Sequence, residues 1–417
     1  MIIRLVPLLS LLSIARATHL SDKTQQAVWD VMNQISTHSW ENGTKVEAIL
    51  ESKYARYSVF GSSSPFPLTS GLGDQMPEVM DVAQVTMNNR PAAVNASQNA
   101  GSLLKDDAAG DPASLGISII LANASTGNQQ VKGVGYGDAA TAQLNYLLYH
   151  VPRTTSGAIS HRANEPQLWS DSVYMVPPFL AFYGAAQNNQ TLLQLAYEQC
   201  KLYREALKQD TNLWRHITGG NGTSDPKDWA TGNGWAAAGM LRVWSTMKWS
   251  GFADQLSNEM GDLVNWIREI LDASKSCVTK KGLFHNWMTD KNSFEDASAA
   301  ALLSTVGLRL STLNITNDYV DTSLNLLSAA SSYVNSTGYL TNVVNPLDFS
   351  KPSDHSPEGQ SFLIMAYAAH KDWDNAGRAG HTKNDGLGKN SGAEQTVAIF
   401  RRFVASFVAL LAISISL

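Results

Sequence analysis

Apolar residues recur at helical spacing along most of the chain. Within residues 24–35, for example, Val28, Val31 and Met32 fall on one side of a helix. The same spacing predicts further helices at residues 75–87, 112–122, 138–148, 173–183, 192–207, 235–247, 252–273, 297–310, 319–334 and 360–370. Residues 42–72 are rich in Ser, Gly and Pro and lack this pattern, which predicts irregular structure there. Alternating patterns typical of strands are sparse, so we predict a mainly helical protein.

The predicted helices come in pairs, and the loops between pairs carry Gly, His, Trp and Asp. Each pair spans roughly fifty residues, a length in the range of helical repeat units. Helical hairpins stacked side by side bury their apolar faces against one another. Six such hairpins closed into a ring would form an all-α (α/α)6 barrel, with the connecting loops gathered at one end as a cleft. We expect this barrel to occupy residues 18–377, because no internal domain boundary is evident.

The composition permits a large core and disfavours some functions. The chain has 417 residues, of which 44% are hydrophobic and 16% charged, so disorder is not expected. A net charge of −5 gives no indication of nucleic-acid binding. Eleven Trp and thirteen Tyr residues supply flat aromatic faces of the kind that carbohydrate sites use, although most buried Trp residues simply form core.

Both ends of the chain resemble processing signals. Residues 1–17 have a basic residue, an apolar run and a small-x-small end, which is typical of a secretory signal peptide. Residues 378–392 are predicted to be a linker that ends in small residues, and residues 393–417 form a spacer and an apolar tail. Together they predict a GPI-anchor signal, whose tail is removed, and hence a protein held at the cell surface or cell wall. Seven Asn-x-Ser/Thr sequons support the secretory route: Asn42, Asn95, Asn123, Asn189, Asn221, Asn314 and Asn335.

The sequence predicts no cofactor and no catalytic metal. The histidines lack metal-ligand spacing, since no His-Glu-x-x-His segment occurs. Cys200 and Cys277 are too few for a thiolate metal site or a disulfide scaffold, but in an oxidising compartment they could pair. The absence of a Gly-x-Ser-x-Gly elbow weighs against a serine esterase.

One short segment carries the strongest candidate chemistry. It places His161, Arg162 and Trp169 just before Asp171, and an apolar run predicted to be helical follows. A carboxyl between an indole and an apolar run is in surroundings that favour protonation, as a general acid requires. The alternative is structural: Ser170 or Asp171 could cap the helix by accepting its first free N–H groups.

Two later loops carry further candidates. Trp229 and Trp235 flank a Gly-rich turn that contains Thr231 and Asn233, so the two indoles could wall a sugar-sized pocket. On spacing alone, a turn that opens a helix between two core tryptophans is the more ordinary interpretation. His285 lies in the next loop, in the segment GLFHNW. The order Ser-Pro-Glu in the later segment SPEGQ is typical of a helix start.

These segments together resemble the unsaturated rhamnogalacturonyl hydrolase family, glycoside hydrolase family 105, a group of six-hairpin glycosidases. The matching pieces, in the family's order across residues 111–373, are SHR with WSD-x-x-YM, LWRH, WATGNGW, GLFHNW and SPEGQ. The resemblance implies an (α/α)6 barrel. It also implies an oligosaccharide substrate, with removal of a 4,5-unsaturated galacturonyl residue from the non-reducing end of a pectin (rhamnogalacturonan) fragment.

The resemblance assigns roles to individual residues. In that family the counterpart of Asp171 is the general acid, which protonates C4 of the enol ether and then helps water to add at C5. Asp111, in the segment GDPASLG, matches a second catalytic aspartate. Substrate contacts are implied for His161, Arg162, Trp169, Met175, His216, Trp229, Thr231, Asn233, Trp235 and His285.

One position departs from the family motif. The motif usually has an arginine that reaches the substrate carboxylate where this chain has Thr231, and a threonine cannot supply a bidentate charged contact. Arg162 or Arg215 could compensate; otherwise the substrate is neutral or differently placed. Two alternatives therefore stay open. One is an inverting glycosidase on another cell-wall glycan, whose acid and base would lie about 6.5–9.5 Å apart. The other is a surface glycan-binding protein that has lost activity.

Overall fold

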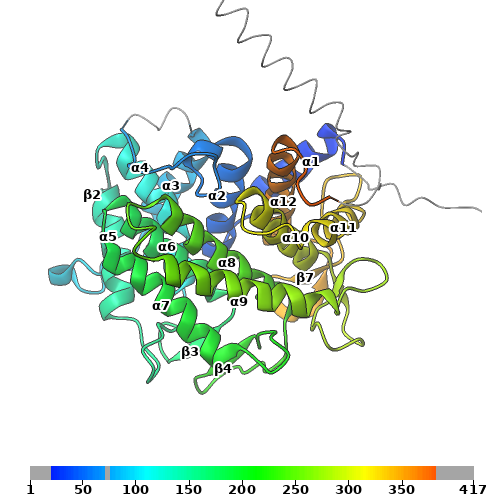
Figure 1. The fold of residues 1–417 in the computed structure, drawn as a ribbon. Helices are drawn as coiled ribbons and strands as arrows, with labels where there is room; N and C mark the ends of the chain where they lie inside the picture. The colour runs from blue at the N-terminus through cyan, green and yellow to red at the C-terminus, as the bar shows by residue number, and fades with distance from the viewer. Residues whose placement is uncertain (1–19, 71–75, 382–417) are drawn as a thin grey trace, which may run out of the picture.

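The computed structural model describes residues 20–70 and 76–381 (Figure 1). Within these residues the chain forms twelve α-helices, arranged in two layers. The inner helices are α2 (Ser39–Lys53), α4 (Gly116–Thr126), α6 (Ser172–Ala186), α8 (Ala230–Trp249), α10 (Ala297–Thr312) and α12 (Pro357–Asn375). The outer helices are α1 (Asp22–Ile35), α3 (Pro77–Asn89), α5 (Tyr136–Tyr149), α7 (Gln190–Leu207), α9 (Ser257–Lys275) and α11 (Val320–Ser331).

Contacts between the inner helices close a ring. α2 packs on α12, α12 on α10, α10 on α8 and α8 on α6. The short 3-10 helix Asp111–Leu115 leads directly into α4 and contacts both α6 and α2, which fills the remaining place. The prediction of an all-α (α/α)6 barrel is therefore confirmed.

The two layers differ in burial, and the sequence explains why. The outer helix α9 buries a single face, on which residues such as Leu263 and Ile267 lie four positions apart. The inner helix α10 is buried at every position over residues 297–311 and consists mostly of Ala, Leu, Ser and Thr. Small residues let inner helices approach closely: at Gly239 of α8, an added Cβ would lie 2.2 Å from the carbonyl oxygen of Val173 on α6.

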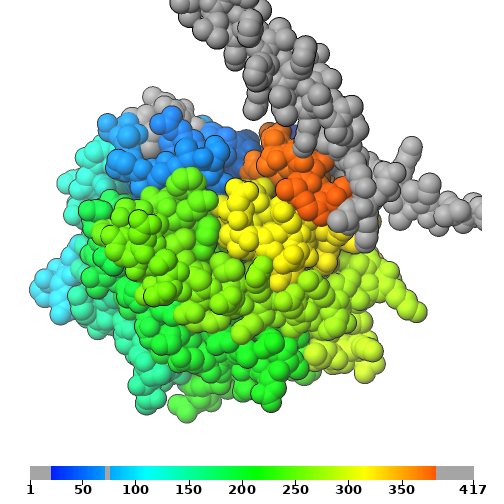
Figure 2. Space-filling model, viewed as in Figure 1, coloured from blue at the N-terminus to red at the C-terminus, as the bar shows by residue number. Residues whose placement is uncertain are grey.

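The sixth helical pair joins the two ends of the described chain. α1 packs against α12, so the first outer helix lies beside the last inner helix. Figures 1 and 2 show the blue N-terminal region next to the orange C-terminal helix. The backbone N–H of Leu20 donates to the hydroxyl of Tyr367 in α12 at 3.1 Å. The barrel is therefore completed by contacts between residues at opposite ends of the sequence.

Helix α2 lies in a stretch that was predicted to be irregular, and that prediction is wrong. α2 is an inner helix buried on nearly every side, so it has no single apolar face to reveal it. Its buried residues include charged side chains such as Glu47 and Glu51, which interrupt any apolar periodicity.

These carboxylates belong to what we call the buried ion cluster, which consists of the buried residues Glu47, Glu51, Arg242 and Arg309 and of the partly exposed Asp372 at its edge. Arg242 of α8 donates to Glu47 at 2.6 Å and also to Glu51. Arg309 of α10 donates to Glu51 at 2.9 Å and also to Asp372 of α12. Burial raises the pKa of Glu47, and the positive charge of Arg242 opposes that rise. The cluster links four inner helices across the centre of the ring.

Four short antiparallel ladders lie in the connecting loops of the described chain. β1 (Gln130–Val131) pairs with β2 (Val134–Gly135), β5 (Phe284–His285) with β6 (Glu295–Asp296), and β7 (Val343–Asn345) with β8 (Asp348–Ser353). β3 (Gln167–Trp169) pairs with β4 (Ile217–Gly219) and so joins two different loops, with Trp169 opposite Ile217.

Several predictions concern the chain ends and the cysteines. The signal peptide (residues 1–17), the GPI signal (residues 393–417) and most of the linker (residues 378–392) lie outside the described residues. Over the two described ranges, no helix is both long and apolar enough to cross a bilayer. Cys200, in α7, and Cys277, just after α9, are both free thiols, so the pairing that the sequence left open does not form in this structure.

Candidate active site

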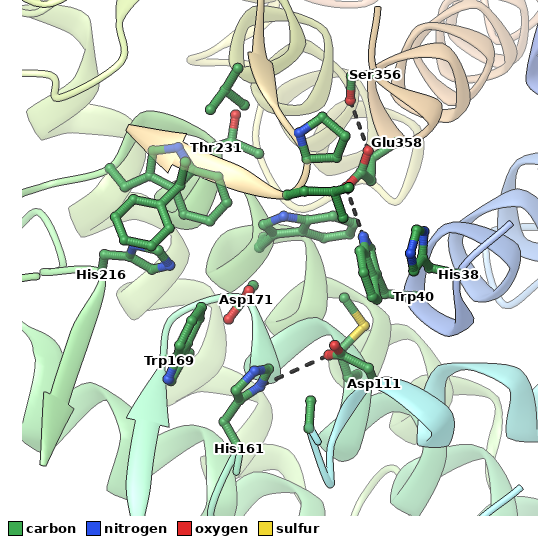
Figure 3. Close-up of a pocket in the computed structure, with 18 of the residues that line it drawn as sticks. His38, Trp40, Asp111, His161, Trp169, Asp171, His216, Thr231, Ser356 and Glu358 are labelled. Carbon is green, nitrogen blue, oxygen red and sulfur yellow. Dashed lines mark hydrogen bonds and ion pairs between the residues drawn. The ribbon is translucent and has the colours of Figure 1, made fainter. Parts of the chain in front are cut away.

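The six inner helices begin at the same end of the barrel, and a pocket of about 570 Å³ opens there (Figure 3). Residues at or beside these helix starts line it: Asp171 precedes α6, Trp229 precedes α8 and Ser356 precedes α12. The loops that lead from outer to inner helices supply most of the remaining wall. Because a helix N-terminus carries a partial positive charge, this end of the barrel suits a negatively charged ligand.

Asp171 occupies the N-cap position of α6, but its side chain does not cap the helix. Its backbone is already helical, and its carbonyl accepts the Tyr174 N–H at 2.9 Å. The carboxyl lines the pocket (Figure 3), and its buried Oδ1 has no hydrogen-bond partner among the described residues. Ser170 does not cap either, because its buried hydroxyl is also unpartnered in the described chain. The capping alternative therefore does not apply, and one oxygen of Asp171 is left for a ligand.

Asp111 reaches the pocket from the start of the 3-10 helix that precedes α4. Its Oδ1 lies 3.9 Å from Nδ1 of His161. Burial raises the pKa of Asp111 well above its usual range, and the negative charges of Asp171 and Asp106 raise it further, against the opposing charge of Arg162. Asp111 is therefore easier to protonate than an exposed aspartate.

His161 favours its neutral form at neutral pH. Burial lowers its pKa to about 4, which outweighs the attraction of the Asp171 charge. The imidazole stacks on Trp169, with ring centroids 4.6 Å apart. The imidazole also approaches Asp111, with Nδ1 3.9 Å from Oδ1 of that carboxyl.

Across the pocket from Trp169 lies a wall that the sequence did not reveal (Figure 3). Trp40, near the start of α2, donates its indole N–H to Oε1 of Glu358 at 2.8 Å. Ser356 donates to Oε2 of the same carboxyl at 2.8 Å, and His38 stacks on Trp40. Because α2 was not predicted, no feature of the sequence identified His38 or Trp40 as pocket residues. Ser356 and Glu358 were recognised as a helix start and as part of the family segment SPEGQ, but not as pocket residues; the helix start is confirmed, since the Ser356 hydroxyl accepts the backbone N–H three residues on.

Glu358 is a titratable group within the pocket wall. Burial raises its pKa to about 7, the charge of Glu41 adds to that rise, and the hydrogen bonds from Trp40 and Ser356 oppose it. The stability that this group contributes is present below its usual pKa of 4.5 and is lost as pH rises through about 7.

Glu358→Gln is therefore expected to flatten the pH dependence of stability. Between about pH 4 and pH 8 the variant should gain on the order of 3 kcal/mol relative to the wild type, because the amide never has to ionise in the interior. Its carbonyl can still accept from Trp40, and its amide can donate to Ser356. Denaturant unfolding of both proteins at several pH values measures the change, and a difference that stays constant with pH would contradict it.

Met175, Trp229, Thr231 and Trp235 also line the pocket. The Gly-rich stretch between the two indoles is not a turn but the beginning of α8 itself. Both tryptophans therefore project from one helix start, on the pocket side of the inner ring. Both indoles line the pocket, and the local structure that places them there is a helix start rather than a turn.

Asn233 and His285 do not line the pocket. The Asn233 amide accepts the Trp214 N–H at 2.8 Å and donates to the Trp214 carbonyl at 2.9 Å, which anchors the preceding loop to α8. His285 lies in β5, where its Nδ1 is 2.7 Å from the carbonyl oxygen of Ser293. Both side chains are therefore held by polar contacts with backbone groups outside the pocket.

Thr231, which occupies the position of the family arginine, is hydrogen-bonded to the buried side chain of Asp296. Its hydroxyl donates to Oδ2 of Asp296 at 2.5 Å, and burial raises the pKa of Asp296. Two cationic side chains do line the pocket, Arg162 and Lys105, and neither has an ion-pair partner within the described residues. Arg215 does not line the pocket. Of the two arginines considered as substitutes, only Arg162 is in position.

Comparisons with known proteins were consistent with this fold. The family model for Glycosyl Hydrolase Family 88 matches residues 77–336, more than half of the chain. A search of curated proteins found no match. Among solved structures, a possible member of the GH105 family from Klebsiella pneumoniae is similar with a TM-score of 0.66 at 16% identity, over 85% of this chain and 94% of that chain.

Two further structures show the same likeness. A family 105 glycoside hydrolase from C. acetobutylicum has a TM-score of 0.62 at 14% identity, over 83% of this chain and 99% of that chain. A glycosyl hydrolase family 88 protein from Bacteroides vulgatus has a TM-score of 0.62 at 11% identity, over 84% of this chain and 97% of that chain. At these identities the similarity concerns the fold.

Proposed function

Since the chain belongs to glycosyl hydrolase family 88, we propose that its pocket binds a 4,5-unsaturated uronic acid at the non-reducing end of an oligosaccharide and hydrates the double bond. The protein is a glycoside hydrolase. The finer proposal, which rests on the sequence resemblance, is that the oligosaccharide is a pectin (rhamnogalacturonan) fragment and the released sugar an unsaturated galacturonyl residue.

The observation that carries the proposal is the unpartnered carboxyl oxygen of Asp171 in the pocket, close to Asp111 and His161. In the proposed reaction the Asp171 carboxyl gives its proton to C4, and the double bond opens. Water then adds its oxygen to C5 and returns a proton to Asp171, so the acid is regenerated. The resulting hemiketal opens and releases the rest of the oligosaccharide as an alcohol. Asp111 lines the same pocket and can form a hydrogen bond with the sugar.

The assay for this function is direct. The purified protein is incubated with lyase-treated pectin, and the ultraviolet absorbance of the unsaturated uronate is followed. Loss of absorbance together with release of a shortened oligosaccharide supports the proposal. Release of a saturated sugar would instead indicate an inverting glycosidase, and binding without turnover would indicate a glycan-binding protein.

Arg162 is proposed to bind the substrate carboxylate in place of the missing family arginine. It lines the pocket, it adjoins His161, and its guanidinium lies 6.0 Å from the centroid of the Trp169 ring. An unpaired carboxylate in a pocket is costly, and a guanidinium is suited to pairing with one. Lys105 also lines the pocket, but this residue is exposed to solvent. We therefore propose Arg162, rather than Lys105, as the residue that binds the carboxylate.

Arg162→Ala is expected to lower uronate turnover by about tenfold or more, the scale of one lost charge-assisted hydrogen bond. Thr231→Arg should be tolerated or raise turnover, because it restores the family's cation. Arg215→Ala is the matched control, since Arg215 does not line the pocket. Initial rates of the three variants on lyase-treated pectin test this, and unchanged turnover in Arg162→Ala would instead favour a neutral sugar.

Attachment to the cell surface through a GPI anchor is proposed from the sequence alone. The support is the small residues near 390–392, the spacer and the apolar tail at residues 404–417. Treatment of intact cells with a GPI-specific phospholipase should release the protein into the medium. Recovery of the tail peptide from the mature protein would argue decisively against the anchor.

A further inference from the structure

His216 lines the pocket beside Trp169 and contacts a buried carboxylate on its far side. Its Nδ1 lies 3.2 Å from Oδ2 of Asp225, and both side chains are almost fully buried. The ring packs edge-to-face with Trp169 and Phe349 and is tilted against Trp229, with centroids 5.1, 4.4 and 4.3 Å away. Three aromatic side chains thus hold the imidazole in one orientation.

Asp225 is itself held as a hydrogen-bond acceptor. Its Oδ1 accepts the backbone N–H of Lys227 at 3.2 Å, and its Oδ2 accepts the indole N–H of Trp287 at 3.4 Å. Both of these groups can only donate. Burial acts to raise the pKa of Asp225, but the hydrogen bonds from His216, Lys227 and Trp287 lower it below its usual range. Because both oxygens of Asp225 already accept from groups that can only donate, the proton of the 3.2 Å contact belongs on Nδ1 of His216.

The second ring nitrogen of His216, Nε2, differs from Nδ1 in its hydrogen bonding. Nε2 of His216 is buried and has no hydrogen-bond partner among the described residues. When Nδ1 carries the proton of a neutral imidazole, Nε2 presents a lone pair. The pocket is the place where a partner for that lone pair can enter, because His216 is part of its wall.

We propose that Asp225 is a positioning residue for the reaction: it fixes the Nδ1–H tautomer of His216, so that Nε2 accepts a hydrogen bond from a hydroxyl of the bound sugar. This inference rests on the proposed function for the identity of the sugar. The tautomer itself does not depend on the substrate and can be measured without it.

Asp225→Asn is the informative substitution. An asparagine has one carbonyl oxygen, so it cannot accept from Lys227 on one side and from His216 and Trp287 on the other. If its amide group faces His216, it donates to Nδ1 and forces the proton onto Nε2, which then cannot accept from a hydroxyl. We expect turnover of lyase-treated pectin to fall about tenfold to hundredfold, the scale of leaving a buried polar group without its hydrogen-bond partner.

Asp228→Asn is the matched control. Asp228 is another almost fully buried aspartate of the same loop, but it neither lines the pocket nor contacts His216. This control should keep near wild-type turnover. In a His216→Ala background, Asp225→Asn should cause little further loss, because Asp225 is proposed to act through the histidine. An additional tenfold loss in that background would overturn the positioning role.

The tautomer is read from long-range ¹H–¹⁵N correlation spectra of the unliganded protein, with the His216 signals assigned by their absence in His216→Gln. The expected result is a protonated Nδ1 and an unprotonated Nε2. A proton on Nε2 overturns the inference even if the enzyme hydrates unsaturated uronates. Conversely, the expected tautomer with no turnover of unsaturated uronates would leave the inference standing and count against the proposed substrate. Because the spectrum is recorded on the wild type, it determines the tautomer of His216 even if Asp225→Asn fails to fold.

Discussion

Asp171→Asn is expected to lower the rate on an unsaturated uronate by at least about a hundredfold, the lower end of what general acid catalysis contributes. The amide keeps the shape of the side chain but has no acidic proton to give. The substitution should leave the fold intact, because the Asp171 side chain makes no capping hydrogen bond to α6. Initial rates and thermal melting of the purified variant measure the two effects separately.

Ser170→Ala provides the neighbouring control for this variant. Its hydroxyl is buried and unpartnered in the described structure, and it does not line the pocket. Activity should therefore remain near the wild-type level. If Asp171→Asn retained nearly full activity in the same assay, Asp171 would not be the acid, and Asp111 would become the residue to test.

Glu51→Gln is expected to destabilise the protein by about 3–5 kcal/mol, the usual cost of removing one partner from a buried ion pair. Glu51 accepts from Arg242 and Arg309 and its side chain is fully buried. The amide removes the charge and turns an N–H₂ donor toward one of two guanidinium groups that can only donate. Chemical denaturation measures the loss of unfolding free energy.

Asp318→Asn is the matched control for the ion cluster. Asp318 pairs with Arg268 at 3.2 Å on the outer surface, where 67% of the Asp318 side chain is exposed. Exposed pairs of this kind contribute about 0–1 kcal/mol, so this variant should melt close to the wild type. Similar losses in Glu51→Gln and Asp318→Asn would mean that burial of the cluster does not determine its energetic importance.

Much of the fold could be predicted from the sequence because the outer helices expose one face to solvent and most inner helices are long runs of mainly apolar and small residues. A surface helix such as α9 shows its apolar stripe directly, and the predicted pairing of α4 with α5, α6 with α7, α8 with α9 and α10 with α11 is seen in the structure. Helix α2 could not be found in this way, because it is buried all round and carries ionised residues that are neutralised by α8 and α10. A helix that is buried all round can still be recognised when its residues are mostly apolar, as in α10, but α2 combines full burial with charged residues and shows neither signal.

The site was only partly predictable for a related reason. His161, Trp169 and Asp171 lie close together in the sequence, and the short motif around them brings them into one wall. Trp40 and Glu358 are 318 positions apart and meet only because the ring closes. Asp225, in a polar loop without a distinctive motif, gains its proposed role solely from its contact with His216.

The pairing of α1 with α12 has a consequence for how the chain can be made. Synthesis proceeds from the N-terminus, so α1 and α2 emerge while their partner in the ring is still hundreds of residues away. Until α12 (Pro357–Asn375) is complete, the inner face of α2 has no cover on one side. Contacts so distant in sequence form slowly, and growing chains with exposed apolar surface are prone to aggregate. We therefore expect the growing chain to be prone to aggregation until α12 is made, and circular permutation, which would move the chain break to another outer loop, would change which pair of helices closes the ring last.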